Sequence, residues 1–164
     1  MKPSLYLETS IPSYLVARAS RDIVVLAHQE LTRRWWEKRC GLYEIYVSPT
    51  VLDEASRGDQ QAADQRMEIL KAFKVLDDTP EIERLTKQYH TKLRLPDGAI
   101  RDATHLAFAC YYAIDYLMTW NCAHIANAEN VRRLMELNRT LGMTTPTICT
   151  LEELMGMEGE SHDS

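Results

Sequence analysis

Short apolar segments alternate along this chain with longer segments in which apolar residues recur every three or four positions. The short segments have the length and residue types of β-strands, and the longer ones have the period of amphipathic α-helices. The strands predicted in this way are Leu5–Leu7, Ile45–Val47, Lys74–Leu76, Tyr116–Thr119 and Thr147–Cys149.

Several predicted helices begin at clear start signals. Ser48-Pro49 and Thr79-Pro80 each join an N-cap residue to a proline at the first helical position, and the segment from Thr150 to Glu153 has the form of a capping box. The predicted helices are one that opens at Pro12, Ile23–Lys38, one from Pro49 to Gly58, Ala62–Phe73, one from Pro80 to about Leu93, Ala99–Ala113, Asn130–Thr140, and a final one from Thr150.

The alternation of strands and helices is typical of βαβ units. We therefore expect an α/β fold, a three-layer α/β/α sandwich around a mainly parallel central sheet. The chain has 164 residues and shows no repeat or linker, so residues 1–155 are expected to form a single domain. The polar, glycine-containing segment 156–164 is expected to be a flexible tail.

Composition and charge narrow the class of protein. The chain is 45% hydrophobic and 26% charged, as in ordinary soluble proteins. It contains no apolar run of membrane-spanning length and no secretory signal, so we expect a cytoplasmic protein without a membrane partner. The cysteines are widely spaced and favour free thiols over a zinc site. The net charge of −5 argues against a protein that coats nucleic acid, but it does not exclude a nuclease.

Polar residues follow the predicted strands at the sheet edge where ligands of such folds bind. Glu8 comes directly after the first strand, and Asn121 follows the strand Tyr116–Thr119. Glu54 lies in the second turn of the helix after the second strand, and Asp102 lies near the start of the most apolar helix. Because these elements meet at one edge, their side chains are expected to converge on one pocket.

Clustered carboxylates repel one another unless a cation lies between them. Mg²⁺ and Mn²⁺ prefer oxygen ligands and retain bound water, which such a metal can activate for attack on a phosphodiester. The pattern therefore predicts a metal site that cleaves phosphodiester bonds without a nucleophilic side chain.

The candidate acids also have structural interpretations. Glu8 could simply face water, and Asp102 could complement the helix dipole. Asp53 could be the functional acid in place of Glu54. Val51, however, precedes Glu54 by three residues and so lies on the same helix face, which favours an inward Glu54.

Neighbouring polar residues could support the site or the fold. Thr9 and Ser10 could contact a metal-bound water or a phosphate, or they could cap the helix that opens at Pro12. His105 could orient Asp102 or contact phosphate, but a buried structural histidine is the preferred interpretation.

Other polar and aromatic residues have a plainer interpretation. Asn121 alone could serve a turn, and His124 and Asn127 are interpreted as residues that fix the loop after it. The Trp35-Trp36 pair is assigned to core packing and a partner interface rather than to base stacking.

Together, these motifs resemble the PIN-domain family over about residues 4 to 155. The motifs are Tyr6-Leu7-Glu8-Thr9-Ser10, Ser48-x-x-Val51-x-x-Glu54, Asp102-Ala103-x-His105-Leu106-Ala107 and Thr119-Trp120-Asn121-x-x-His124-Ile125-Ala126-Asn127. No single motif is specific to the family, but the occurrence of all four in this order and spacing is characteristic of it.

The resemblance implies a Mg²⁺- or Mn²⁺-dependent ribonuclease, similar to the stand-alone bacterial VapC-like toxins of type II toxin–antitoxin pairs. It also implies an RNA substrate, a homodimer and an inhibitory antitoxin partner. By this resemblance, Glu8, Glu54 and Asp102 fall on the first three acidic positions of the family and Asn121 on the fourth.

Two positions depart from the family pattern, because Glu8 replaces the usual aspartate and Asn121 the frequent fourth acid. The neutral amide of Asn121 motivates an alternative, a catalytically weakened module that binds RNA or a protein partner. A phosphate-ester hydrolase of another class is a third hypothesis. It is disfavoured because D-x-D, G-x-G-x-x-G and P-loop motifs are absent from the sequence.

Overall fold

The computed structural model describes residues 1–156 of the chain. The predicted flexible tail, 156–164, lies outside these residues except for Gly156. Within the described residues, no helix is both long enough and apolar enough to cross a membrane.

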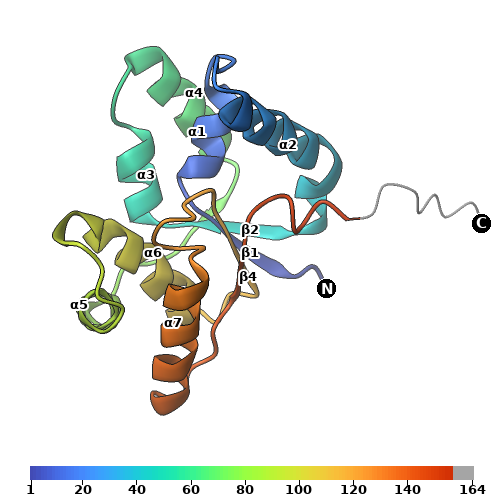
Figure 1. Ribbon diagram of the computed structural model, residues 1–164. Coiled ribbons are helices and arrows are strands. Elements are labelled where there is room, and N and C mark those ends of the chain that lie inside the picture. The colour runs from blue at the N-terminus through green and yellow to red at the C-terminus, as the bar shows by residue number, and fades with distance from the viewer. Residues whose placement is uncertain (157–164) are drawn as a thin grey trace, which may run out of the picture.

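A parallel sheet of five strands, in the order β3-β2-β1-β4-β5, forms the centre of the molecule (Figure 1). The strands are β1 (Ser4–Leu7), β2 (Glu44–Val47), β3 (Lys74–Val75), β4 (Tyr116–Met118) and β5 (Thr147–Cys149). β1 pairs with β2 on one side and with β4 on the other, so that Tyr6 aligns with both Tyr46 and Leu117. Each predicted strand is present, and the prediction of a parallel sheet is confirmed.

The helices largely follow the predicted boundaries. They are α1 (Ser10–Val16), α2 (Ile23–Arg39), α3 (Pro49–Ala55), α4 (Gln60–Leu70), α5 (Pro80–Lys92), α6 (Ile100–Tyr111) and α7 (Ala128–Thr140), with 3₁₀ turns at Cys40–Leu42 and Asp97–Ala99. The predicted caps form as expected, because the Ser48 and Thr79 side chains accept hydrogen bonds from the first turns of α3 and α5.

Helices cover both faces of the sheet. α1, α2 and α4 lie on one face, whereas α5, α6 and α7 lie on the other (Figure 1). α3 contacts both α4 and α6, so it lies where the two helical layers approach each other. The predicted three-layer α/β/α sandwich is therefore confirmed.

The core is built around β1, where Leu5, Tyr6 and Leu7 are fully buried. A central parallel strand that is covered by helices on both faces is expected to be a nearly continuous apolar run, and Leu5–Leu7 is such a run. Trp35 is also fully buried and stacks on Tyr43 with ring centroids 5.6 Å apart, as the core-packing interpretation required.

Between Thr150 and Gly156, where the described residues end, no helix forms, so the predicted helix start at Thr150 was wrong. Residues 151–155 form turns with hydrogen bonds from residue 154 to 151 and from 155 to 152. Half of the capping box exists, since the Glu153 carboxylate accepts a hydrogen bond of 3.2 Å from the Thr150 amide. Gly156 then adopts a positive φ of 73°, a conformation that ends helices.

Candidate active site

The candidate site lies where the order of the strands reverses. The chain passes from β1 through β2 to β3, then returns to place β4 on the opposite side of β1. The segments that leave the carboxyl ends of β1 and β4 diverge at this point, which is where ligands of open α/β sheets bind. Glu8 follows β1 directly, and Thr119 and Asn121 follow β4.

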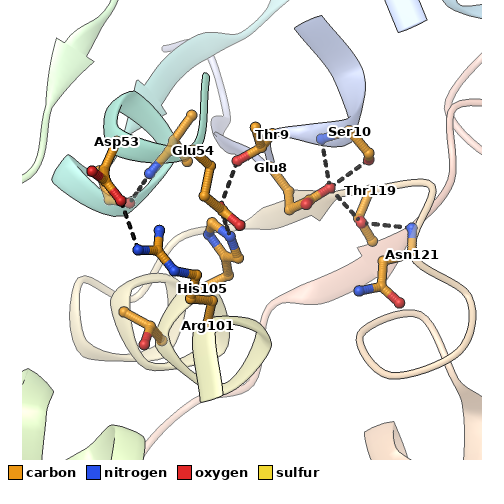
Figure 2. A network of polar contacts seen from close by, with 12 residues as sticks. Glu8, Thr9, Ser10, Asp53, Glu54, Arg101, His105, Thr119 and Asn121 are labelled. Atoms are coloured by element: carbon orange, nitrogen blue, oxygen red, sulfur yellow. Dashed lines mark hydrogen bonds and ion pairs between the residues drawn. The ribbon is translucent and has the colours of Figure 1, made fainter. Parts of the chain in front are cut away.

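Glu8 is held in place by hydroxyl and amide donors. Its side chain is buried, and its Oε2 atom accepts hydrogen bonds from the Ser10 amide (3.0 Å), the Ser10 hydroxyl and the Thr119 hydroxyl (2.8 Å) (Figure 2). The Ser10 hydroxyl also accepts a hydrogen bond of 2.8 Å from the Trp120 amide. Ser10 thus joins the ends of β1 and β4 while it fixes the Glu8 carboxylate.

Glu54, rather than Asp53, joins this cluster from α3. The Oε1 atom of Glu54 accepts hydrogen bonds from the Thr9 hydroxyl (2.8 Å) and from His105 Nε2 (2.6 Å). Asp53 instead points away from Glu54 and pairs with Arg57 and Arg101 (Figure 2). The inward orientation expected from the position of Val51 is therefore the one observed.

His105 connects Glu54 to the buried core. Its side chain is fully buried in α6, and its Nδ1 atom lies 2.7 Å from the Tyr6 hydroxyl, which is itself 2.7 Å from the Ser48 hydroxyl. One interpretation of the sequence has His105 orient Asp102, but the candidate acid that it contacts is Glu54. The interpretation of a buried, hydrogen-bonded histidine is met, and its partner is one of the candidate acids.

His105 and Glu54 behave as an ion pair. Burial works against a charged His105, but the hydrogen bond to Glu54 and the charges of Glu8, Glu54 and Asp102 together raise its pKa. The pKa of Glu54 is lowered, because contact with His105 and Thr9 outweighs the effect of burial. A protonated His105 donates through both ring nitrogens, and Tyr6 can then pass a hydrogen bond to Ser48.

Asp102 is oriented by a histidine that the sequence assigned only to the loop. Asp102 Oδ2 lies 2.8 Å from His124 Nδ1, and the His124 amide donates a hydrogen bond of 3.0 Å to Asn121 Oδ1. The backbone amide of Asn121 in turn donates a hydrogen bond of 2.9 Å to the Thr119 hydroxyl. The loop after β4 therefore links Glu8, through Thr119 and Asn121, to Asp102. The spacing Asn121-x-x-His124 was the available signal for this link.

The donor atoms suit a hard divalent cation. In each of Glu8, Glu54 and Asp102, a single carboxylate oxygen accepts all of the hydrogen bonds described above. The second oxygen of each carboxylate accepts none within residues 1–156. All three also act electrostatically on His105, which places them around one buried ring. Two glutamates, an aspartate and an amide oxygen are the ligand types that Mg²⁺ and Mn²⁺ prefer.

The three acids nevertheless do not form a complete coordination site in this conformation. Across residues 1–156, no group of three or more His, Cys, Asp or Glu side chains has an arrangement that could hold a metal ion. A cation coordinated by Glu8, Glu54 and Asp102 would therefore require these side chains to move closer together.

Comparison with known proteins places the fold. A family model of the PIN domain matches residues 5–121. The toxin VapC20 of Mycobacterium tuberculosis, described as cleaving the sarcin–ricin loop, superposes with a TM-score of 0.58 at 18% identity, over 73% of this chain and 92% of that chain. VapBC2 of Rickettsia felis, solved with a DNA fragment from its promoter, gives a TM-score of 0.50 at 15% identity, over 89% of this chain and 97% of that chain. A search of curated proteins finds no match.

Proposed function

The chain belongs to the PIN-domain family, and from this premise we propose that it is a divalent-metal-dependent endoribonuclease. The proposed reaction is hydrolysis of RNA phosphodiester bonds at the cluster of Glu8, Glu54, Asp102 and Asn121. The proposed cofactor is Mg²⁺ or Mn²⁺.

The observation that carries this proposal is the arrangement of acids from three separate elements around His105. Glu8 leaves β1, Glu54 belongs to α3 and Asp102 to the first turn of α6, and the charge of each raises the pKa of the same buried imidazole. Ionised groups are costly to bring together without a compensating charge, and such placement is typical of functional sites.

The side chains have separate tasks in this proposal. A bound cation would activate water and offset charge on the phosphate during attack. Ser10 and Thr119 hold Glu8, while Thr9 and His105 hold Glu54, so that each acid presents its remaining oxygen. His124 does the same for Asp102. This support reduces the freedom that the acids would otherwise lose on binding a cation.

The likeness to VapC20 and VapBC2 supports a further part of the proposal. One is described as a toxin that cleaves the sarcin–ricin loop, and the other was solved bound to a DNA fragment from its promoter. We propose by analogy that this chain is the toxin of a type II pair, that it forms a homodimer and that an antitoxin protein inhibits it in the cytoplasm.

The alternative function is a catalytically weakened module that binds RNA or a protein partner. It is favoured by the chemistry of Asn121. This side chain brings no charge, and its Oδ1 atom already accepts a hydrogen bond from the His124 backbone amide. Such a module would bind its partner without cleaving it and would gain little stability from Mn²⁺.

The test is an RNA cleavage assay in Mn²⁺, Mg²⁺ and EDTA, with single-stranded and structured RNAs. We expect cleavage that needs the metal and falls at least 100-fold in Asp102→Asn, since that change removes one ligand charge. Asp97→Asn, which alters a carboxylate in the exposed turn before α6, is the matched control and should cleave as the wild type does. Absence of cleavage by the wild type in every metal would favour the binding module.

A further inference from the structure

Arg101 extends from the first turn of α6 toward α3 at the edge of the acidic cluster (Figure 2). Its Nη2 atom lies 2.7 Å from Asp53 Oδ2, and within residues 1–156 Asp53 is the only ion-pair or hydrogen-bond partner of its guanidinium. A guanidinium has five N–H donors in a fixed plane, so most of its hydrogen-bonding capacity is unused here. Its side chain is 37% exposed and can be reached by a ligand.

Asp53 binds a second arginine through the same oxygen. Arg57 Nη2 also lies 2.7 Å from Asp53 Oδ2, and the two arginines together lower the pKa of Asp53. If Arg101 turned toward a ligand, Asp53 would keep Arg57 as its counter-ion. The exchange would therefore leave no carboxylate without a partner.

Arg101 lies beside the candidate site, because Asp53, the residue that its guanidinium contacts, directly precedes Glu54 in α3 (Figure 2). His105 also carries charge there, but its ring is fully buried and cannot contact a polymer outside. His124 is engaged by Asp102. Arg101, which precedes Asp102 in the sequence, therefore combines exposure, proximity to the acids and free donors.

An RNA backbone approaching three carboxylates is repelled unless cationic groups receive its phosphates. An arginine suits this task because its planar donors match two oxygens of one phosphate. We infer that Arg101 is a phosphate-binding residue that receives an RNA phosphate beside the acidic cluster, with Asp53 holding it in a ready position. This inference rests on the proposed function, because it assumes that RNA reaches this site.

Asp53 is then a positioning residue rather than a ligand of the RNA. It holds the Arg101 side chain over α3 before RNA arrives, so less rotamer freedom is lost on binding. The proposed contact is to the phosphodiester backbone, so it does not distinguish one RNA sequence from another.

The experiment measures binding of a short, fluorescein-labelled single-stranded RNA in Ca²⁺ and in EDTA over a range of salt concentrations. It compares the wild type with Arg101→Gln, Arg57→Gln and Asp53→Asn. Arg57→Gln is the matched control, because it removes the same charge from the same oxygen of Asp53. Thermal unfolding of each variant establishes that it is folded.

We expect Arg101→Gln to bind the RNA about tenfold more weakly at low salt, as for loss of one charge-assisted contact. The slope of log K against log salt should fall by about 0.7, the value for one phosphate contact on a single strand. Arg57→Gln should remain within about twofold of the wild type, because it retains both Arg101 and Asp53. Asp53→Asn should weaken binding by about threefold, less than Arg101→Gln, because it retains the guanidinium but loses the contact that positions it.

Three results would overturn the inference. They are unchanged RNA affinity in Arg101→Gln, an equal loss in all three variants, and no salt-dependent binding by the wild type. Cleavage in Mn²⁺, measured on the same proteins, separates this inference from the proposed function. Cleavage by the wild type with equal affinities throughout would reject the phosphate-binding role alone, whereas selective weakening in Arg101→Gln without any cleavage would reject the nuclease alone.

Discussion

His105 is the residue on which the candidate site depends most. It has no solvent exposure, yet both ring nitrogens have partners, Tyr6 inside the core and Glu54 at the site. A buried charge is tolerated only when it is paired and hydrogen-bonded, and this arrangement meets both conditions. The same ring thus connects stability of the core with the position of a candidate ligand.

The stability contributed by this pair should depend on pH. His105 has a raised pKa when folded, so its contribution is complete below about pH 6.5 and is lost as the pH rises through the folded value. Glu54 has a lowered pKa, so its contribution is complete above about pH 4.3 and is lost as the pH falls through its folded value. The pair should therefore stabilise the protein most between these limits.

The measurement is the free energy of unfolding in urea and EDTA, for wild type and Glu54→Gln, at pH 5.5 and pH 9. At pH 5.5 we expect Glu54→Gln to be less stable by about 1–3 kcal/mol, because the buried His105 loses its charged hydrogen-bond partner. At pH 9 the difference should shrink. A difference that stays constant or grows toward pH 9 would show that the two groups do not form an ion pair.

Asn121 tests the charge of the site. Asn121→Asp adds a fourth acid beside Thr119 and His124 while keeping an oxygen that can accept the His124 amide. Added repulsion should lower the melting temperature in EDTA, and the extra ligand charge should tighten Mn²⁺ binding by about tenfold. A titration of melting temperature with Mn²⁺ measures both effects. Equal Mn²⁺ affinity in the two proteins would place the cation away from Asn121.

At the level of single residues, the sequence could select candidate acids but could not predict the side chains that hold them. Glu8, Glu54 and Asp102 were identifiable because each follows a recognisable strand or helix start. The contacts His105–Glu54 and His124–Asp102 join residues 51 and 22 positions apart. Such contacts depend on how helices pack across the sheet, which local pattern does not contain.

Among the secondary-structure elements, the start of α3 serves the fold and the site together. The Ser48 hydroxyl accepts a hydrogen bond of 3.3 Å from the Val51 amide, and it also lies 2.7 Å from the Tyr6 hydroxyl. The cap of α3 is therefore the far end of the hydrogen-bonded chain that reaches Glu54 through His105. A change in this cap should affect both helix stability and the acid.

We expect Ser48→Ala to destabilise the protein by about 2–3 kcal/mol, because it removes a helix cap and leaves the buried Tyr6 hydroxyl, which still contacts His105, without an acceptor for its proton. Thr79→Ala removes only the cap of α5, where Thr79 Oγ1 accepts from the Ile82 amide at 3.3 Å, and should cost about 1 kcal/mol. Urea unfolding of both variants measures the contrast. Equal losses would mean that the Tyr6 contact adds nothing to the cap.

Helix starts were predictable and the last helix was not, for one physical reason. Ser48-Pro49 and Thr79-Pro80 are followed by segments that bury apolar residues, which stabilise the helix that the cap begins. Thr150–Glu153 has cap residues, but Gly156, six residues after Thr150, turns the backbone to positive φ. A cap without a long apolar face behind it does not make a helix.

For the molecule as a whole, the alternating pattern predicted a layered parallel sheet but not the order of its strands. The order of the strands depends on pairings such as that of β1 with β4, in which Tyr6 aligns with Leu117, a residue far away in the sequence. The reversal of order between β1 and β4 is what brings Glu8 and Asn121 to one edge. The position of each acid follows from its own strand or helix, whereas their proximity follows from the order of the strands in the sheet.

The most direct test of a metal site is the anomalous diffraction of crystals soaked in MnCl₂. We predict a Mn²⁺ peak at coordination distance, about 2.1 Å, from the oxygens of Glu8, Glu54 and Asp102 that accept no hydrogen bonds here. The same soak of Asp102→Asn crystals should show the peak weakened or absent. A wild-type cluster that stays free of Mn²⁺ at millimolar concentrations, with its carboxylates in the positions described here, would contradict the assignment of these residues to a metal-dependent nuclease.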